Sequence, residues 1–567
     1  MSRLEAKTQS LCTTGPLSSQ SIRQSLSVLQ GIVMSCYGPS GRLKQVHNGK
    51  GGCVLTTSLS STLLGNFSVT HPALRLLVAS VRNHISSFSD CGLFTAILCC
   101  NLIDKYLSLN IPPHTVIKIS GSLLAMCIDY LNSDGCMCRV TADFGSSQSL
   151  LQITYTVLSS KPACMLTIKE AEYVSTLIVQ AFLLSIPNGK GASVTIGKSV
   201  IVHVEGRSVM ESSVVPGLLI EMPEFCWRRL DPSTGLPSTD IKLAMFSVSL
   251  SGDFSDTGEG NLCLASDVNP ESIMLDQLHV LGKRLVSDQV NVLVCQKVIH
   301  PSLKQFLKKQ NILALERVGA ALMEPLSQMT GAKPIASLSS VSTASYGSLR
   351  ALSKMSHGSK HYVHLIPSDT SVSSIVLCNR NETSLKELTT TCQAAQHILQ
   401  MTLKKPWVLL GGGCTETHLS AFIRYKSANI STTFLEELNC SSAQYKMVAD
   451  CFCKSLESVA QSLEHDGGEM LMDLQDGHLW SILPDAASEI GHRCGCRMHR
   501  RRDDLQWNVL GSQCSPFNPE IARDKCLLKA SHQLILDCFA AKCNGLQVAV
   551  DTAGLILDLS YVVEDKN

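Results

Sequence analysis

The chain has 567 residues, which is too long for one hydrophobic core and predicts roughly two to four domains. Its formal net charge of +1 provides no overall field that would recruit nucleic acid or an anionic membrane, so no nucleic-acid partner is expected. Charged residues make up only 17% and the mean hydropathy is +0.15, which indicates that partner subunits cover part of the apolar surface.

The N-terminal residues 1–21 lack the apolar core of a secretion signal. No run of about 18 apolar residues without charge occurs, so a membrane span is not expected. The most apolar stretch, LFTAILCCNLI at 93–103, has the length of a buried core helix. The 25 cysteines are scattered, many of them in apolar runs, and without secretion they are expected to be buried thiols in a reducing compartment.

The first part of the chain, residues 20–140, is predicted to be mostly helical. The segment SIRQSLSVLQGIVMSCY (21–37) has apolar residues at helical spacing and ends at the breaker pair Gly38-Pro39. HPALRLLVASVRNHISSF (71–88) predicts another helix, which is entered through Pro72. Residues 145–190 continue this helical pattern.

The middle of the chain has a different pattern. From about residue 192, β-branched segments are separated by glycine and proline, and over about 205–360 strands alternate with helices. From 385 the helical pattern returns and is expected to run to the end, apart from a polar segment at 484–525 and a closing strand in AGLILDLSYVVED (553–565). We therefore expect an α/β domain inserted into an interrupted, mostly helical one.

Residues 37–44, YGPSGRLK, are the first candidate for phosphate binding. Gly38 and Gly41 flank Pro39 and Ser40, and glycines let backbone amides approach an anion closely. Lys44 could neutralise the charge of that anion. A plain turn of similar sequence is common, so the segment by itself leaves both interpretations open.

Residues 192–199, ASVTIGKS, match a loose phosphate-loop pattern. Ala192 stands where glycine is usual, and the segment ends in Gly197, Lys198 and Ser199. A phosphate loop needs a strand before it and a helix after it, whereas the following SVIVHVEG predicts a strand. A nucleotide site centred on Lys198 is therefore only a minor alternative.

The third candidate is LLGGGCTETH at 409–418, in which Gly411, Gly412 and Gly413 separate an apolar segment from a helix. Such a strand–glycine–helix junction can bring backbone against a nucleotide, or it can be only a tight turn. In either case Glu416 is a first-turn acid that the helix dipole favours.

A cysteine- and histidine-containing segment, HRCGCRMHRRRDD at 492–504, raises the question of a metal site. It offers His492, Cys494, Cys496 and His499, but Cys-x-Cys is tighter than the usual spacing in zinc sites and no second cysteine pair lies at a matching distance. A solvated surface insertion is the favoured interpretation, and its arginines could serve nuclear import or an acidic partner.

Together, these segments resemble the group II chaperonins, the eukaryotic cytosolic and archaeal type of the TCP-1 family. SCYGPSGRLK takes the place of the family's first phosphate loop, HPALRLL that of its His-Pro-Ala helix start, and GGGCTETHLS that of its glycine-rich return. The stretch from VLVCQKVIHPSLKQFLKKQ to MEPLSQMTGAKPIASL resembles the family's apical segment, and GLILDLSYVV its last strand. The matches follow the family's order over nearly the whole chain.

The resemblance implies an α+β multidomain fold with a mostly helical equatorial domain, an intermediate domain and an inserted α/β apical domain. It places the equatorial domain at 1–145 and 399–567, the intermediate domain at 146–205 and 363–398, and the apical, substrate-binding domain at 206–362.

The chain departs from the chaperonin pattern where that family hydrolyses ATP. The family's Thr-Asn-Asp-Gly turn aligns with TTSL, so that Ser58 and Leu59 replace the aspartate and the glycine. Its Gly-Asp-Gly-Thr-Thr loop aligns with SDCGL (89–93), which keeps Asp90 as a weak Mg²⁺ ligand and has Cys91, Gly92 and Leu93 in the other places. The aspartate that activates water falls near Ala394.

Because phosphoryl transfer depends on positioned charge, these losses predict very slow or absent ATP hydrolysis, with no catalytic residue intact. Weak binding of ATP with Mg²⁺ is still expected. By the resemblance, the residues that would contact the nucleotide are Gly38, Pro39, Ser40, Gly41, Lys44, Asp90, Gly411, Gly412 and Gly413.

The expected function is that of a divergent chaperonin-like chaperone that assists the folding or assembly of client complexes. NPESIMLDQLHVL (269–281) supplies apolar residues on one face, suited to core packing or to gripping a client. By the resemblance, the partners would be client proteins, other chaperonin-like subunits, the cytosolic chaperonin and components of the Bardet–Biedl ciliary-trafficking complex. The expected location is the cytoplasm, at or near the centrosome, with the nucleus as an open alternative. An ATP-hydrolysing ring chaperonin is the main alternative function.

Overall fold

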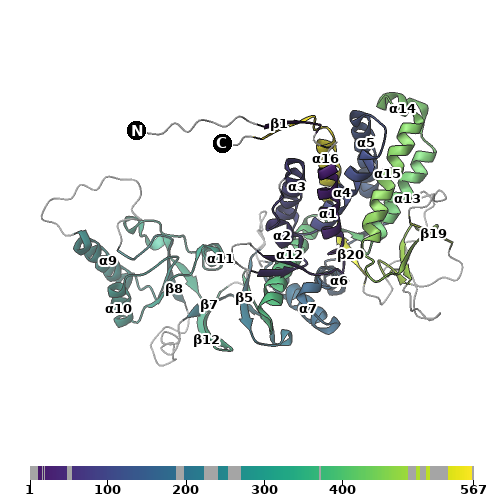
Figure 1. Ribbon diagram of the computed structural model, residues 1–567. Coiled ribbons are helices and arrows are strands. Elements are labelled where there is room, and N and C mark those ends of the chain that lie inside the picture. The colour runs from purple at the N-terminus through teal and green to yellow at the C-terminus, as the bar shows by residue number, and fades with distance from the viewer. Residues whose placement is uncertain are drawn as a thin grey trace, which may run out of the picture. The chain divides into compact units, whose positions relative to one another are not determined.

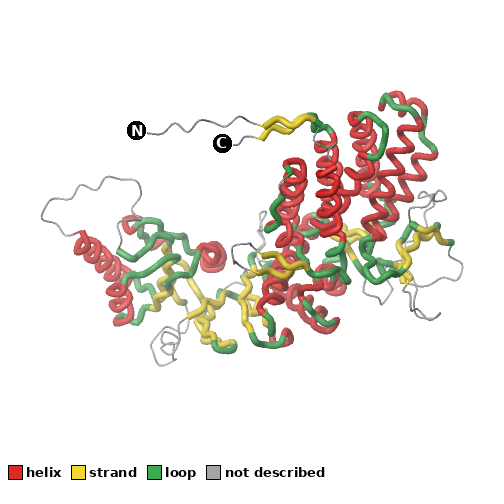
Figure 2. The backbone as a smooth tube through the Cα atoms, viewed as in Figure 1, coloured by secondary structure: helices red, strands yellow, loops and turns green. Residues whose placement is uncertain are grey.

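The structure is a computed structural model that describes residues 11–15, 17, 20–47, 54–69, 71–186, 197–222, 240–252, 270–368, 372–482, 493–498, 506–510 and 534–564. The chain divides into two compact units, one made of Met1–Ser175 and Lys386–Asn567 and the other of Thr176–Leu385. Figures 1 and 2 show that the chain contains both helices and sheets, which confirms the mixed α and β fold class. The finer division into five domain segments stays a prediction.

The first unit is mainly helical, as predicted. Its helices are α1 (Gln20–Met34), α2 (Ser60–Gly65), α3 (Pro72–Phe88), α4 (Gly92–Leu107), α5 (Pro113–Asn132), α6 (Ser147–Ser159), α13 (Cys414–Ala428), α14 (Thr432–Leu438), α15 (Ser442–Gln461) and α16 (Phe539–Leu557). Two further helices, α7 (Ile168–Leu184) and α12 (Glu382–Lys404), connect this unit to the second one along the chain.

Helix α4 is the centre of the first unit. Every residue from Gly92 to Ile103 is buried, because α1, α3, α15 and α16 all pack against this helix. An apolar helix without a polar face must be covered all round, so the prediction of a core helix at 93–103 is confirmed. The start of α3 is also as predicted: Pro72 is its first residue, and the His71 side chain accepts a hydrogen bond from Ala73 N at 3.2 Å.

The described residues of the first unit form four small sheets. Their strand orders are β1 (Leu11–Thr14) with β21 (Tyr561–Glu564); β2 (Lys44–His47) with β3 (Val54–Thr57); β20 (Leu536–Cys538), β15 (Trp407–Leu410) and β4 (Arg139–Thr141); and β18 (Arg493–Cys494), β17 (Leu479–Ile482), β16 (Glu469–Asp473) and β19 (Trp507–Val509). All of their strand pairs are antiparallel.

The sheet from β16 to β19 corrects the expectation that the chain is helical from 385 to its end. A tight turn after β16 reverses the chain, because the Asp473 carboxylate accepts hydrogen bonds from the backbone N–H groups of Asp476 and Gly477 at 2.5 and 3.0 Å. The closing strand is also shorter than predicted. Residues up to Leu557 continue α16, since Ala553 and Ile556 extend its buried face, and only Tyr561–Glu564 form a strand.

The second unit is an α/β module, as predicted for about 205–360. Among the residues that the structure describes there, the strands form three sheets, in the orders β10 (Leu313–Leu315), β9 (Val292–Cys295), β8 (Ile241–Phe246) and β11 (Gly347–Leu349); β12 (Ala351–His357), β13 (Lys360–Ile366) and β7 (Leu218–Met222); and β5 (Ser199–Glu205), β14 (Ser373–Asn379) and β6 (Ser213–Pro216). Its helices are α9 (Pro270–Ser287), α10 (Pro301–Lys309) and α11 (Ala320–Thr330). The apolar strands β8 and β10 run parallel to β9, with α9 and α10 packed on each other and contributing to one core with β9.

Most cysteines of the described residues are buried free thiols, as the sequence predicts. Among the helices that the structure describes, none combines the length and the apolar character needed to cross a bilayer.

Candidate functional site

The first phosphate-loop candidate forms a tight turn after α1. Gly38 has φ +82°, and a Cβ atom at Gly41 would lie 2.3 Å from the Cys36 carbonyl oxygen, so this backbone path requires both glycines. Gly41 N donates to the Gly38 oxygen at 3.1 Å, and Arg42 N donates to the Ser35 oxygen at 2.7 Å. Two amides that a phosphate could use are therefore already bonded within the turn.

The remaining residues of this turn lie around it. Pro39 and Ser40 are exposed, whereas Lys44 begins β2 and its Nζ donates to the Arg42 carbonyl oxygen at 3.0 Å. Burial raises the pKa of the Cys36 thiol, and the nearby Lys44 ammonium opposes this shift. The Lys44 charge thus lies beside the turn, as a phosphate-neutralising role would require.

A protein carboxylate binds the turn of residues 57–59, which the sequence did not predict. The Glu387 side chain on α12 accepts hydrogen bonds from Thr57 Oγ1 at 2.9 Å, Ser58 N at 2.7 Å and Leu59 N at 3.1 Å. The Ser58 hydroxyl also donates to it, at 3.0 Å, and Glu387 is only 4% exposed. The turn that carries Asp-Gly in the chaperonin pattern is therefore satisfied by a group of the chain itself.

The loop of residues 89–93 keeps its carboxylate, Asp90, which lies near a lysine. Asp90 Oδ1 lies 3.9 Å from Lys161 Nζ, where this cation opposes the binding of a second one such as Mg²⁺. Cys91 has a left-handed backbone, φ +60°, and caps α4 without a side-chain hydrogen bond. A Cβ atom at Gly92 would lie 2.5 Å from Ser60 Oγ, so the loop packs closely on α2.

Ala394 lies on α12 at the position that the resemblance assigns to a water-activating aspartate. It is 8% exposed, and one turn further on His397 Nδ1 is 2.8 Å from Ser89 Oγ. Residues three apart share one helix face, so Ala394 lies on the face that meets the loop of Asp90. Ala394 has a methyl group and no carboxylate.

The third glycine motif is the predicted strand–glycine–helix junction between β15 and α13. Gly412 and Gly413 have φ +62° and +82°, and α13 begins at Cys414. Cβ atoms at Gly38 and Gly413 would lie 2.7 and 3.2 Å from the two Cδ atoms of Leu463. The structure therefore brings the glycine turn of residues 38–41 and the glycine motif of residues 411–413 together around the Leu463 side chain.

A buried cluster of charges lies next to these loops. Lys542 Nζ on α16 forms ion pairs with Glu416 and, at 2.9 Å, with Asp537 Oδ2, and it lies 4.2 Å from the centroid of the Phe94 ring. Burial acts to lower the pKa of Lys542, but the carboxylates of Asp537 and Glu416 hold it well above its usual value. Glu416 thus has a buried cationic partner, which the first-turn interpretation did not include.

The Walker-like segment, residues 192–199 with the loose phosphate-loop pattern, belongs to the second unit, whereas the loops above belong to the first. Gly197 N donates to the Ser185 oxygen at 2.7 Å, Lys198 forms an ion pair with Glu324, and Ser199 begins strand β5. The predicted strand after Ser199 is confirmed, so the helix that a phosphate loop needs is missing there. Ala192 lies outside the described residues.

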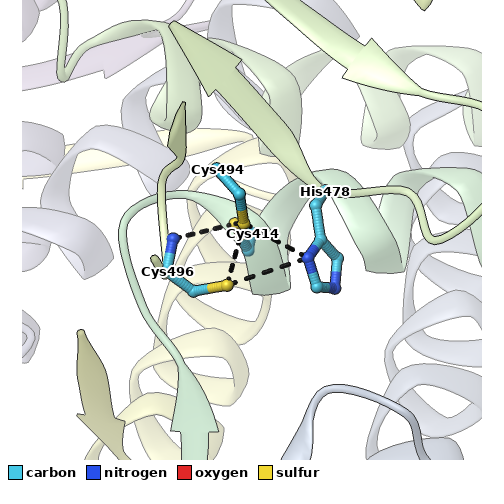
Figure 3. Close-up of side chains that lie close together, drawn as sticks. All are labelled: Cys414, His478, Cys494 and Cys496. Carbon is cyan, nitrogen blue, oxygen red and sulfur yellow. Dashed lines mark hydrogen bonds between the residues drawn. The ribbon is translucent and has the colours of Figure 1, made fainter. Parts of the chain in front are cut away.

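Cys494 and Cys496 are not part of a solvated surface insertion, which corrects the sequence-based interpretation. They are 1% and 0% exposed, because β18 pairs with β17 and brings Cys494 opposite Trp480. Figure 3 shows both thiols beside Cys414 and His478, and the possible ligand atoms of all four lie within 4.8 Å of one another. His492 and His499 lie outside the described residues.

Comparison with known proteins identifies the family of the chain. A model of the TCP-1/cpn60 chaperonin family matches residues 29–567. The chain belongs to this family. It is 52% identical over 573 residues to Molecular chaperone MKKS of Mus musculus and 52% identical over 572 residues to that of Homo sapiens, with 100% of each chain covered. It is also 24% identical over 477 residues to thermosome subunit alpha of Sulfurisphaera tokodaii, with 80% of each chain covered.

The family match confirms the chaperonin resemblance that the ordered motifs predict. Within the family, the motifs point to the chaperonin-like protein of the McKusick–Kaufman and Bardet–Biedl syndromes, and the full-length similarity to MKKS confirms that placement. The family generally binds ATP with Mg²⁺. At the positions that the resemblance assigns to this chemistry, the Glu387 carboxylate is bonded to residues 57–59, Asp90 lies 3.9 Å from Lys161, and Ala394 has no carboxylate.

Replacement of Glu387 by alanine is expected to lower the free energy of unfolding by about 3 kcal/mol, because it leaves several buried donors of residues 57–59 without an acceptor. Chemical denaturation followed by circular dichroism measures the change. Gln393→Ala, at an exposed position of the same helix, is the matched control and should cost far less. Equal stabilities of the two variants would contradict the buried carboxylate contact.

Lys542→Met is expected to destabilise the chain by about 3–5 kcal/mol, because it leaves the buried carboxylate of Glu416 and the partly buried carboxylate of Asp537 without a cation. The exposed Lys446 on α15 supplies the control substitution Lys446→Met, which removes one lysine charge without opening a buried pair. Denaturation midpoints of the two variants that coincide would show that the buried ion pairs do not form.

Proposed function

We propose that this chain is a chaperonin-like chaperone that holds partly folded or unassembled subunits of client complexes, and that it binds nucleotide weakly without hydrolysing it at chaperonin rates. Membership in the chaperonin family and the similarity to proteins named Molecular chaperone MKKS support the chaperone part. The observation that carries the second part is Ala394, which has no carboxylate and lies three residues before His397, whose Nδ1 is 2.8 Å from Ser89 Oγ in the loop of Asp90.

The chemistry of phosphoryl transfer gives the reason. Catalysis of this reaction consists almost entirely of positioning and charge stabilisation, by Mg²⁺ and by a group that orients the attacking nucleophile. Removing a group that acts only in the transition state lowers the rate but leaves ground-state affinity largely intact. The glycine turn and Lys44 could therefore still contact a phosphate weakly, whereas turnover requires carboxylates that Ser58 and Ala394 do not provide.

Helix α9 supplies a surface that suits client binding. Its buried residues Leu278, Leu281 and Leu285 pack into the core of the second unit. The same helix exposes Ile273, Leu275 and Val280, the last of them 65% exposed. Apolar side chains held on a rigid helix and open to solvent can bind the apolar surface of an unassembled subunit. Both roles that the sequence allows for this segment, core packing and client gripping, can thus be served by different side chains of the same helix.

The clients and partners are proposed from the resemblance. They are components of the Bardet–Biedl ciliary-trafficking complex as clients, and other chaperonin-like proteins together with the cytosolic chaperonin as partners. The proposed location is the cytoplasm at or near the centrosome, with the nucleus as a second location to examine. Affinity purification of the full chain with mass spectrometry identifies the partners, and imaging of the tagged chain in ciliated cells identifies the location.

Purified protein is expected to hydrolyse ATP no faster than the double variant Lys44→Ala with Asp90→Ala, in a steady-state assay with Mg²⁺. Robust turnover that Asp90→Ala abolishes, together with double rings in sedimentation, would instead support an ATP-hydrolysing ring chaperonin. A third outcome identifies the Walker-like alternative: nucleotide binding that is lost in Lys198→Ala and unchanged in Lys44→Ala.

Val280→Asp is expected to weaken client holding by about tenfold, because burying a valine side chain contributes about 1.5 kcal/mol. Suppression of aggregation of a chemically denatured client protein, without nucleotide, measures the effect. Gln277→Asp adds the same charge at an exposed polar position of α9 and should leave holding nearly unchanged. Equal holding by both variants and the wild type would exclude this face of α9 as the client surface.

A further inference from the structure

Four side chains with metal-ligating chemistry converge in the first unit (Figure 3). Cys414 is the first residue of α13, His478 lies in the turn before β17, and Cys494 and Cys496 lie at the end of β18 and just after it. Their exposed fractions are 0%, 3%, 1% and 0%. The four residues come from three separate stretches of chain, which is why no local spacing motif reveals them.

The distances between the ligand atoms suit one small metal ion. Cys494 Sγ lies 3.6 Å from Cys414 Sγ and 3.0 Å from Cys496 Sγ. His478 Nδ1 lies 3.4 Å from Cys494 Sγ and 3.7 Å from Cys496 Sγ. Four ligands around a zinc ion with Zn–S bonds of ~2.3 Å form a tetrahedron whose sulfur–sulfur edges are about 3.8 Å. The separation of 3.6 Å is close to this edge, whereas the separation of 3.0 Å is shorter, so Cys494 and Cys496 Sγ would move apart by less than about 1 Å around a bound ion.

The backbone is built to bring these side chains together. A Cβ atom at Gly412 would lie 2.2 Å from the Gly495 oxygen, and a Cβ atom at Gly495 would lie 2.0 Å from the Gly412 oxygen. Only a glycine pair lets the junction before α13 pass so close to the turn between Cys494 and Cys496. In addition, Gly495 N donates to the Leu479 oxygen at 2.8 Å, which holds this turn against the strand that follows His478.

The backbone at His478 is held by a separate set of hydrogen bonds. The buried Asp473 carboxylate accepts from His478 N at 3.2 Å and from Trp480 Nε1 at 2.7 Å, besides the amides of the preceding turn. This network fixes the turn from which the ring reaches the thiols, with Nδ1 toward them, as Figure 3 shows. Ligands whose backbone is fixed in this way are already positioned before a metal binds.

A further contact favours thiolates over neutral thiols. Cys496 N donates to Cys414 Sγ at 3.3 Å, and a backbone donor of this kind stabilises negative charge on sulfur. A buried thiolate still needs a positive partner, because an unpaired charge is costly away from water. A divalent cation supplies that charge, and three sulfurs with one imidazole nitrogen form a donor set that zinc prefers.

We propose that Cys414, His478, Cys494 and Cys496 form a structural zinc site. All four positions of a tetrahedral ion would be filled by protein, which is typical of structural rather than catalytic zinc. The ion would tie the sheet of β16 to β19 to the junction of β15 and α13, and so hold the glycine motif of residues 411–413 in place. This site does not depend on the chaperone function proposed above.

The test is the zinc content of the full chain, purified with a tag that contains no histidine and without chelators, and measured by inductively coupled plasma mass spectrometry. About one zinc ion per chain is expected. Cys414→Ser and Cys494→Ser should lower zinc occupancy at least about tenfold after exposure to a competing chelator. The matched control is Cys136→Ser with Cys138→Ser, a second buried Cys-x-Cys pair whose sulfurs are 3.5 Å apart and which belongs to no group of three ligands among the described residues.

A measurement on the wild-type chain keeps the test decisive if the serine variants fail to fold. Replacement of zinc by Co²⁺ should give the visible absorption of tetrahedral cobalt with sulfur-to-cobalt charge-transfer bands in the near ultraviolet. Wild-type protein that contains no zinc and develops no such bands would overturn the proposal. A disulfide between Cys494 and Cys496 in the wild-type chain, or full zinc occupancy in folded Cys494→Ser, would overturn it as well.

Discussion

The burial of α4 on every side is the constraint on which the first unit depends. An apolar helix of this kind is stable only if other helices exclude water all round it, and here α1 and α3 come from the start of the chain while α15 and α16 come from its end. The two ends of the chain must therefore fold together, and the residues between them leave and return as the second unit. The N-terminus of α4 lies at Cys91, beside the loop of Asp90, so the same constraint positions the candidate nucleotide loops.

At the candidate nucleotide loops, the polar groups are bonded to other groups of the protein. The carboxylate of Glu387 satisfies the turn at 57–59, Lys161 faces Asp90, and the glycine turn uses two of its own amides. Loops whose polar groups are bonded within the protein are satisfied without bound nucleotide. This agrees with the proposal that the chain holds clients rather than working by cycles of hydrolysis.

The sequence predicted most elements whose signal is local. Regular apolar spacing closed by breakers identified the helices before residue 190, and β-branched runs between glycines identified the strands of the second unit. The sheet of β16 to β19 was missed because its strands are only two to five residues long and depend on pairing across the chain. Residues 553–557 were taken for a strand because β-branched and leucine residues fit both a buried strand and the inner face of a helix.

What the sequence by itself determined is the family, from the order of its motifs, and the absence of carboxylates at Ser58 and Ala394, since a missing functional group can be read at its own position. Only the tertiary structure decided which groups meet. The Glu387 side chain bonds to Ser58, 329 residues away in the chain, and the Cys414 thiol lies beside that of Cys494, 80 residues away. Such contacts leave no periodic pattern, because they are set by where backbones cross, as at the paired glycines 412 and 495, and not by the neighbours of either residue.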